Sequence, residues 1–139
     1  MVLEDRPNSE QRLNIISYIL LANGIYDILC AFSILWLSKT IEPFIFLSKL
    51  HPNMFFEKEI NENPTIKRLI AYWVLTYGVV RFVVGIIPIN IYTITIATST
   101  YLLEAICFWN EYINNKIVLE KALFVCMFSF SLGVILYFY

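Results

Sequence analysis

The chain has 139 residues, of which 59% are hydrophobic and only 15% are charged. Soluble domains carry about 45–50% apolar and about 25% charged residues, and so short a chain has too little interior to hide this excess from water. The net charge of −1 excludes the electrostatic pattern of a nucleic-acid-binding protein. The composition therefore predicts an integral membrane protein whose surface contacts membrane lipids.

Residues 1–12 are polar and are expected to form an N-terminal tail outside the apolar core of the bilayer. Residues 13–37 then form an apolar run with one ionisable side chain, Asp27. This run is longer than the roughly 7–15 apolar residues of a signal peptide, and it has no small-residue cleavage site. We therefore expect it to be a retained first transmembrane span.

The region 38–67 is the one long loop that the sequence predicts, and Pro52 and Pro64 interrupt it. Within it, the apolar stretch 41–47 is expected to form a short segment in the membrane interface. His51 is the only histidine, and its position in this loop favours a solvated side chain over a general base.

Three further apolar runs, 68–88, 91–109 and 117–139, are each close to the roughly 20 residues that a helix needs to cross a bilayer. The short connection 88–90 predicts a tight helical hairpin of the second and third spans, and 110–116 predicts a second turn. Backbone groups in lipid must be satisfied internally, which favours helices. The sequence thus predicts an all-α polytopic membrane protein of four transmembrane helices.

Residues 13–139 are therefore expected to form one transmembrane domain. Basic residues gather in its long loop and its last turn: Lys39, Lys49, Lys58, Lys67, Arg68, Lys116 and Lys121. The opposite side carries only Arg6 and Arg12. The positive-inside rule then predicts cytosolic loops and two termini that lie in the lumen or outside.

Three ionisable residues fall within the spans, and their depths suggest how they pair. Asp27 and Arg81 lie about two and three residues beyond the midpoints of antiparallel spans, a depth difference of roughly 7 Å that an arginine can reach across. Glu104 lies roughly 10 Å from the depth of Arg81. We therefore expect an Asp27–Arg81 pair, with Glu104 wetted from the cytosolic side.

The neighbours of these charges extend the predicted polar cluster. Asn23 precedes Asp27 by four residues and shares its helix face. Gly78 and Gly85 lie on the face of Arg81, so another helix is expected to approach closely beside the charge.

A buried Asp–Arg pair is more often an assembly device than a reaction centre. The sequence contains no nucleophile, nucleotide or zinc motif, so we assign no catalytic, cofactor-binding or metal-ligating residue and favour a non-enzymatic protein. Glu104 with Glu111 remains open as an acid–base pair.

The second and third spans resemble a known family. Its second span opens with Arg, four residues, Trp, seven residues and Arg, and its third span opens with Tyr-x-Ile-Thr after a turn that contains Asn. The matching residues here are Arg68, Trp73, Arg81, Tyr92 and Thr95. By these features the chain resembles the ergosterol-biosynthesis "28" family of small four-helix scaffolds of the endoplasmic reticulum membrane.

This resemblance implies a non-enzymatic tether that holds the enzymes of sterol C4-demethylation together. Its partners would be other membrane proteins, with self-association as a further possibility. The alternative is a small membrane enzyme or carrier that acts on a sterol or lipid through a polar pocket lined by Asp27, Arg81 and Glu104.

Overall fold

The computed structural model describes residues 9–55 and 62–138, with side chains from residue 14 onward. The fold is all-α, and within these ranges the only β-type pairing is a single bridge between Phe55 and Ile117. The elements in chain order are α1 (Ser9–Phe32), the π-helical turn η1 (Ser33–Leu37), α2 (Glu42–Leu50), the 3-10 turn η2 (Pro52–Met54), α4 (Pro64–Ile86), α5 (Ile91–Ile113) and α6 (Leu119–Phe138). Four segments are long and apolar enough to cross a membrane: α1 with η1, α4, α5 and α6. The predicted polytopic fold is thus confirmed.

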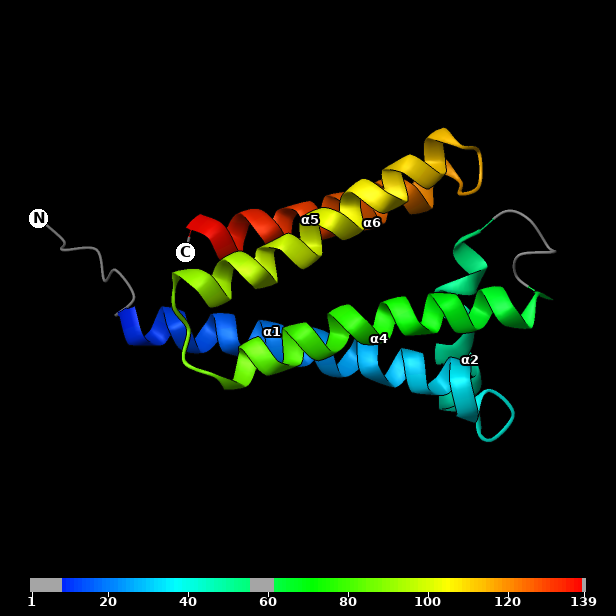
Figure 1. Cartoon of the computed structure of the whole chain (residues 1–139), viewed down its shortest axis with the longest axis horizontal. Helices are drawn as coiled ribbons and strands as arrows, with labels where there is room; N and C mark the ends of the chain where they lie inside the picture. The colour runs from blue at the N-terminus through cyan, green and yellow to red at the C-terminus, as the bar shows by residue number, and fades with distance from the viewer. Residues whose placement is uncertain (1–8, 56–61, 139) are drawn as a thin grey trace, which may run out of the picture.

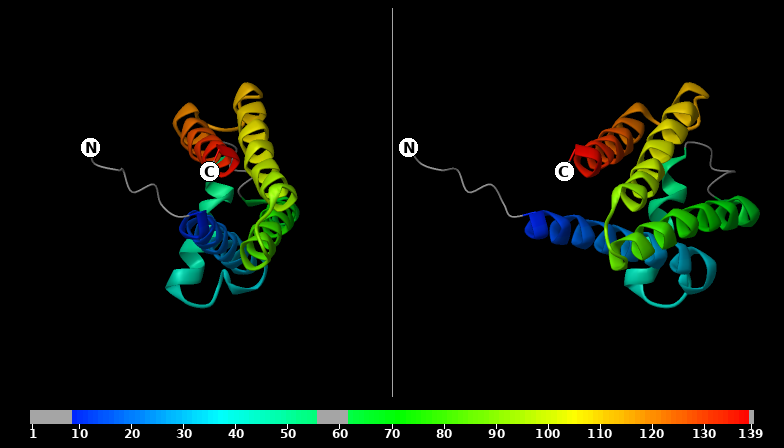
Figure 2. Two further views of the ribbon diagram at one scale, coloured as in Figure 1. Left: turned by 90° about the vertical axis from the view of Figure 1, so that its left-hand side faces the viewer. Right: turned by 60° about the vertical axis from the view of Figure 1, so that its left-hand side comes forward.

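Two helical pairs make up the bundle. Helices α1 and α4 pack side by side along their length, and α5 and α6 form a second pair that crosses the first obliquely (Figures 1 and 2). The short connection from α4 to α5 joins the two pairs. Figure 1 shows the start of α1 and the end of α6 at one end of the bundle, with α2 and the α5–α6 turn at the other.

Local sequence signals define the start of α4 and the short connection between α4 and α5, which belong to different helical pairs. Asn63 caps α4 through Oδ1, which accepts hydrogen bonds from the backbone of Thr65 at 2.9 Å and of Ile66 at 3.3 Å. Helix α4 stops at Ile86 because a residue that precedes proline avoids the helical conformation. Asn90 then starts α5 with a capping box.

The helices do not coincide with the predicted apolar runs. Helix α1 already begins at Ser9, inside the predicted tail 1–12, whose first eight residues lie outside the described part of the chain. The predicted loop 38–67 contains α2 and the first residues of α4, and α2 includes residues 42–47 of the predicted apolar stretch 41–47. Apolar length marks the part of a helix that lies in lipid, whereas caps and prolines decide where the helix ends.

Glycines allow α1 and α4 to approach each other closely. A Cβ atom built on Gly24 would lie 2.6 Å from the backbone nitrogen of Phe82, and one on Gly78 would lie 2.8 Å from Cβ of Asp27. Membrane helices associate through such small residues because lipid provides no hydrophobic drive between them. The close approach brings Asp27 of α1 beside the face of α4 that carries Arg81.

Replacing Gly24 with alanine is expected to lower the free energy of unfolding by about 1–3 kcal/mol, because the added methyl group overpacks a backbone contact. The matched control is Gly133→Ala in α6, where the nearest atom to the new Cβ would lie at 3.5 Å, an ordinary contact. Thermal unfolding of both variants in mild detergent measures the difference. Equal shifts for the two variants would contradict the proposed close packing of α1 on α4.

Candidate functional site

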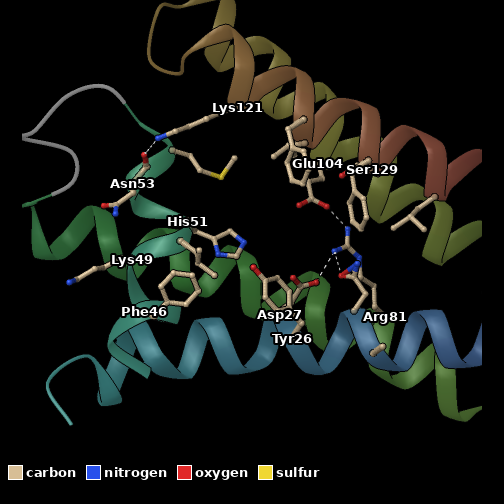
Figure 3. Close-up of a pocket in the computed structure, with 18 of the residues that line it drawn as sticks. Tyr26, Asp27, Phe46, Lys49, His51, Asn53, Arg81, Glu104, Lys121 and Ser129 are labelled. Carbon is tan, nitrogen blue, oxygen red and sulfur yellow. Dashed lines mark hydrogen bonds and ion pairs between the residues drawn. The ribbon is translucent and has the colours of Figure 1, made fainter. Parts of the chain in front are cut away.

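A buried arginine joins three helices in the middle of the bundle. Nη1 of Arg81 on α4 donates to Asp27 Oδ2 at 2.7 Å and to Asn23 Oδ1 at 3.2 Å, both on α1. Its Nε donates to Thr100 Oγ1 at 3.0 Å, and its Nη2 donates to Glu104 Oε2 at 2.5 Å, both on α5. These five residues form what we call the Arg81 cluster, and Figure 3 labels Asp27, Arg81 and Glu104 among them. The cluster connects the two helical pairs of the bundle.

Aromatic rings complete the surroundings of the guanidinium group. The central carbon of Arg81 lies 4.4 Å from the ring centre of Tyr77 and 3.8 Å from that of Tyr101. The Arg81 side chain is only 1% exposed, so its charge is desolvated and depends on these contacts. The arrangement satisfies the positive charge with two carboxylates and two rings.

The structure brings together all four residues of the predicted polar cluster. The Asp27–Arg81 pair that the depth argument predicts is present. The expectation that Glu104 is wetted rather than paired is wrong, because Glu104 binds Arg81 and its side chain is 12% exposed. Helix α5 runs obliquely to α4 (Figures 1 and 2), so its residues change depth less than the roughly 1.5 Å each of an upright helix.

The residues of the family-like motif do not form one site. Trp73 points into the bundle, where its ring stacks on Phe108 with 5.8 Å between ring centres. Arg68, Tyr92 and Thr95 lie exposed on the surface, away from the cluster. Arg81 is the only residue of the family-like motif that belongs to the Arg81 cluster.

Glu111, the open partner of an acid–base pair with Glu104, also lies elsewhere. It is near the end of α5, where it accepts a hydrogen bond from Asn110 at 3.4 Å. The cavity described below does not include it among its lining residues.

A cavity of about 900 Å³ lies beside the Arg81 cluster, between α1, the α2–η2 segment and α6. Its walls are mainly apolar, with residues such as Ile19 of α1 and Phe128 and Leu132 of α6. Asp27, Arg81 and Glu104 lie at its inner end, as Figure 3 shows. The cavity thus combines apolar walls with a charged group deep in the bundle.

Polar residues of the α2–η2 segment and α6 form the outer end, which we call the rim: Lys49, His51, Asn53, Glu120 and Lys121. Lys121 Nζ donates to the backbone oxygen of Asn53, and this bond ties η2 to α6 (Figure 3). The rim therefore brings two distant parts of the chain to one end of the cavity.

The expectation of a solvated His51 is wrong. The side chain is partly buried in the cavity wall, and its Nδ1 has no hydrogen-bond partner in the described part of the chain. Burial, together with the smaller effect of the Arg81 charge, lowers the pKa of His51 from 6.5 to about 4. The imidazole is therefore neutral near pH 7.

Sequence reasoning missed the two tyrosines of the site. Tyr77 precedes Arg81 by four residues, and Tyr101 precedes Glu104 by three, so each shares a helix face with a charge that was singled out. That spacing is the signal that could have found them. No comparable signal in the sequence places the α2–η2 segment over the cavity.

The fold and the site together define a four-helix polytopic membrane protein with a buried charged cluster beside an apolar cavity. No protein-family model matches the chain, and no curated protein or solved structure shows significant similarity to it.

Proposed function

We propose that this protein binds an amphipathic membrane lipid, such as a sterol, in the cavity beside the Arg81 cluster. The observation that carries the proposal is a cavity of about 900 Å³ with apolar walls and charged groups at its inner end. Ligand sites commonly occupy about 300–1,000 Å³ and combine apolar walls with a few polar groups that fix orientation. A cavity with apolar walls and a charged inner end fits binding or transport of a lipid better than a role in helix assembly alone.

The location of the cavity supports uptake of the ligand from the bilayer. One wall is α1 and another is α6, and both helices are long and apolar enough to span a membrane. Ala22 of α1 and Phe124 of α6 line the cavity and are also exposed. A lipid can therefore enter sideways, with its apolar part remaining among apolar groups.

The Arg81 cluster supports binding more than catalysis. Four hydrogen bonds already engage the guanidinium group, and no serine or cysteine nucleophile lies among these contacts. A nucleophile activated by a positioned base, the usual sign of covalent catalysis, is not part of the cluster. We propose that the cluster holds the polar end of the ligand without transforming it.

Replacing Ala22 with tryptophan is expected to weaken lipid binding at least about tenfold, because the indole occupies the space beside the cavity wall. The matched control is Ile25→Trp on the same helix, at a position 46% exposed that does not line the cavity. Lipids retained by each purified variant in mild detergent are extracted and quantified by mass spectrometry. Equal amounts in the two variants would overturn the proposal.

The second candidate function is the membrane scaffold that the family resemblance implies. A groove of about 520 Å³ between α5 and α6, lined by apolar and small residues, favours it. Within the groove, Cys126 donates a hydrogen bond to the backbone oxygen of Ala105, and small residues of this kind let another helix approach. Another membrane protein or a second copy of the chain would bind there. The Ala22→Trp variant separates the candidates, since a scaffold would keep its protein partners while its lipid is lost.

We propose the endoplasmic reticulum membrane as the location, with both termini in the lumen. Lys49 and Lys121 are rim residues, and Figure 1 places α2 and the start of α6 at the end of the bundle opposite the termini. By the positive-inside rule this basic end faces the cytosol. Glycosylation of an acceptor site added before residue 9 would support the lumenal placement, and protection from glycosylation would contradict it.

A further inference from the structure

The inner end of the cavity carries more negative than positive charge. Asp27 and Glu104 together bring two carboxylates, and Arg81 brings the single cation bound to them. The other cations that line the cavity, Lys49 and Lys121, are exposed residues of the rim. With both carboxylates ionised, the cluster has a formal charge of −1 in surroundings where an uncompensated charge is costly.

Once the hydrogen bonds of the cluster are formed, some acceptor atoms remain free, whereas few donors do. Four of the five N–H groups of Arg81 are engaged. In the described part of the chain, hydrogen bonds reach Asp27 only at Oδ2 and Glu104 only at Oε2. Asp27 Oδ1 and Glu104 Oε1 therefore remain as acceptors on side chains that line the cavity and are 4% and 12% exposed.

The net charge of the cluster and its free donors and acceptors favour some polar end groups of a lipid over others. A carboxylate or phosphate would meet two like charges and at most one free N–H group of Arg81. A hydroxyl group can donate one hydrogen bond but leaves the charge of −1 in place. An ammonium group donates three hydrogen bonds, accepts none, and brings the charge of the cluster to zero.

We infer that the cavity selects a long-chain amine, with its ammonium group bound between the free oxygens of Asp27 and Glu104 and its chain along α1 and α6. This inference rests on the proposed lipid-binding function and specifies its ligand class. Figure 3 shows the carboxyl groups of both Asp27 and Glu104 turned toward Arg81. Alcohols of the same length bind more weakly, and fatty acids bind most weakly.

Three probes with one tail and different ends test the inference: dodecylamine, dodecanol and dodecanoate. Each displaces a fluorescent lipid from the full chain in nanodiscs of neutral lipid near pH 7. The amine is expected to bind about tenfold more tightly than the alcohol, and dodecanoate more weakly than both. In Asp27→Asn the cluster is neutral, so the advantage of the amine over the alcohol is expected to fall to about threefold or less.

The matched control is Glu120→Gln, which removes a carboxylate from the rim and leaves the cluster intact. This variant is expected to keep the preference for the amine. Because all variants are measured in the same nanodiscs, each probe partitions into the lipid to the same extent in every measurement. If Asp27→Asn does not fold, Glu104→Gln provides the same neutral cluster.

Equal binding of the three probes, or tightest binding of dodecanoate, would overturn the amine inference while the proposed lipid-binding function stands. An unchanged amine preference in the neutral-cluster variant would also overturn it. Binding of none of the probes, together with no displaceable lipid, would overturn the proposed function itself.

Discussion

Replacing Arg81 with methionine is expected to lower the free energy of unfolding by about 3–5 kcal/mol. Methionine keeps a long unbranched side chain but leaves Asp27 and Glu104 without the cation that both contact. Removal of one partner from a buried ion pair costs more than removal of the pair, because the remaining charge stays desolvated. Thermal unfolding in mild detergent, followed by circular dichroism, measures the loss.

A neutralised variant separates charge from packing as the cause. Arg81→Met combined with Asp27→Asn and Glu104→Gln leaves no unpaired charge, so we expect it to recover most of the stability lost in Arg81→Met. A combined variant as unstable as Arg81→Met would show that the contacts of Arg81 with Tyr77 and Tyr101 outweigh its ion pairs. Arg81→Met as stable as the original chain would contradict the assembly role of the cluster.

The sequence predicts those features that follow from local composition and chain geometry. Apolar length identifies the four spans, and residues 88–90 identify the short connection between α4 and α5, although these helices pack in different pairs. Helical spacing and depth are sufficient to predict the contact of Asp27 with Arg81, because α1 and α4 lie side by side along their length. For two helices that lie side by side, the depth estimated from straight, upright helices is accurate enough to predict which residues meet.

The same estimate is misleading for Glu104 because tilt is a tertiary property. Oblique packing of α5 against α4 brings Glu104 to Arg81, although their positions along upright helices would lie far apart. The angle between two helices depends on which side chains meet at the contact, and a hydropathy pattern does not encode it. Gly24 illustrates this point, since its importance follows only from the atoms of α4 that face it.

Only the polar inner end of the cavity was within reach of the sequence, as the pocket lined by Asp27, Arg81 and Glu104. Its other walls could not be predicted, since they come from segments far apart in the chain. His51 belongs to a polar stretch that ordinarily faces water, yet α2 and η2 bring it into the cavity wall. The bond from Lys121 to Asn53 joins residues 68 positions apart and shows how α6 contributes to the same rim.

The charges of the Arg81 cluster are therefore consistent with both helix assembly and ligand binding. Four N–H groups of Arg81 hold helices together, whereas the free oxygens of Asp27 and Glu104 are available to a ligand. The arginine serves assembly, and the surplus carboxylate charge supports the proposed binding.

Acidification from pH 6.5 to about pH 4 is expected to destabilise the protein through His51. The pKa of His51 is about 4 in the folded chain and 6.5 for an ordinary histidine. Because the folded-state pKa is the lower one, the unfolded state takes up a proton first as the pH falls through this window. The contribution of His51 is a loss of up to about 3 kcal/mol of unfolding free energy at pH 4, and it is absent above pH 6.5.

Comparison with His51→Gln isolates this contribution, because the carboxylates of the chain titrate in both proteins and glutamine does not. We expect the thermal stability of the original chain to fall more steeply between pH 6.5 and pH 4 than that of His51→Gln, with parallel curves above pH 6.5. Curves that stay parallel down to pH 4 would mean that the imidazole is solvated in both states. In that case the burial of His51 in the cavity wall would be contradicted, whereas the bond between Lys121 and Asn53 in the rim would be unaffected.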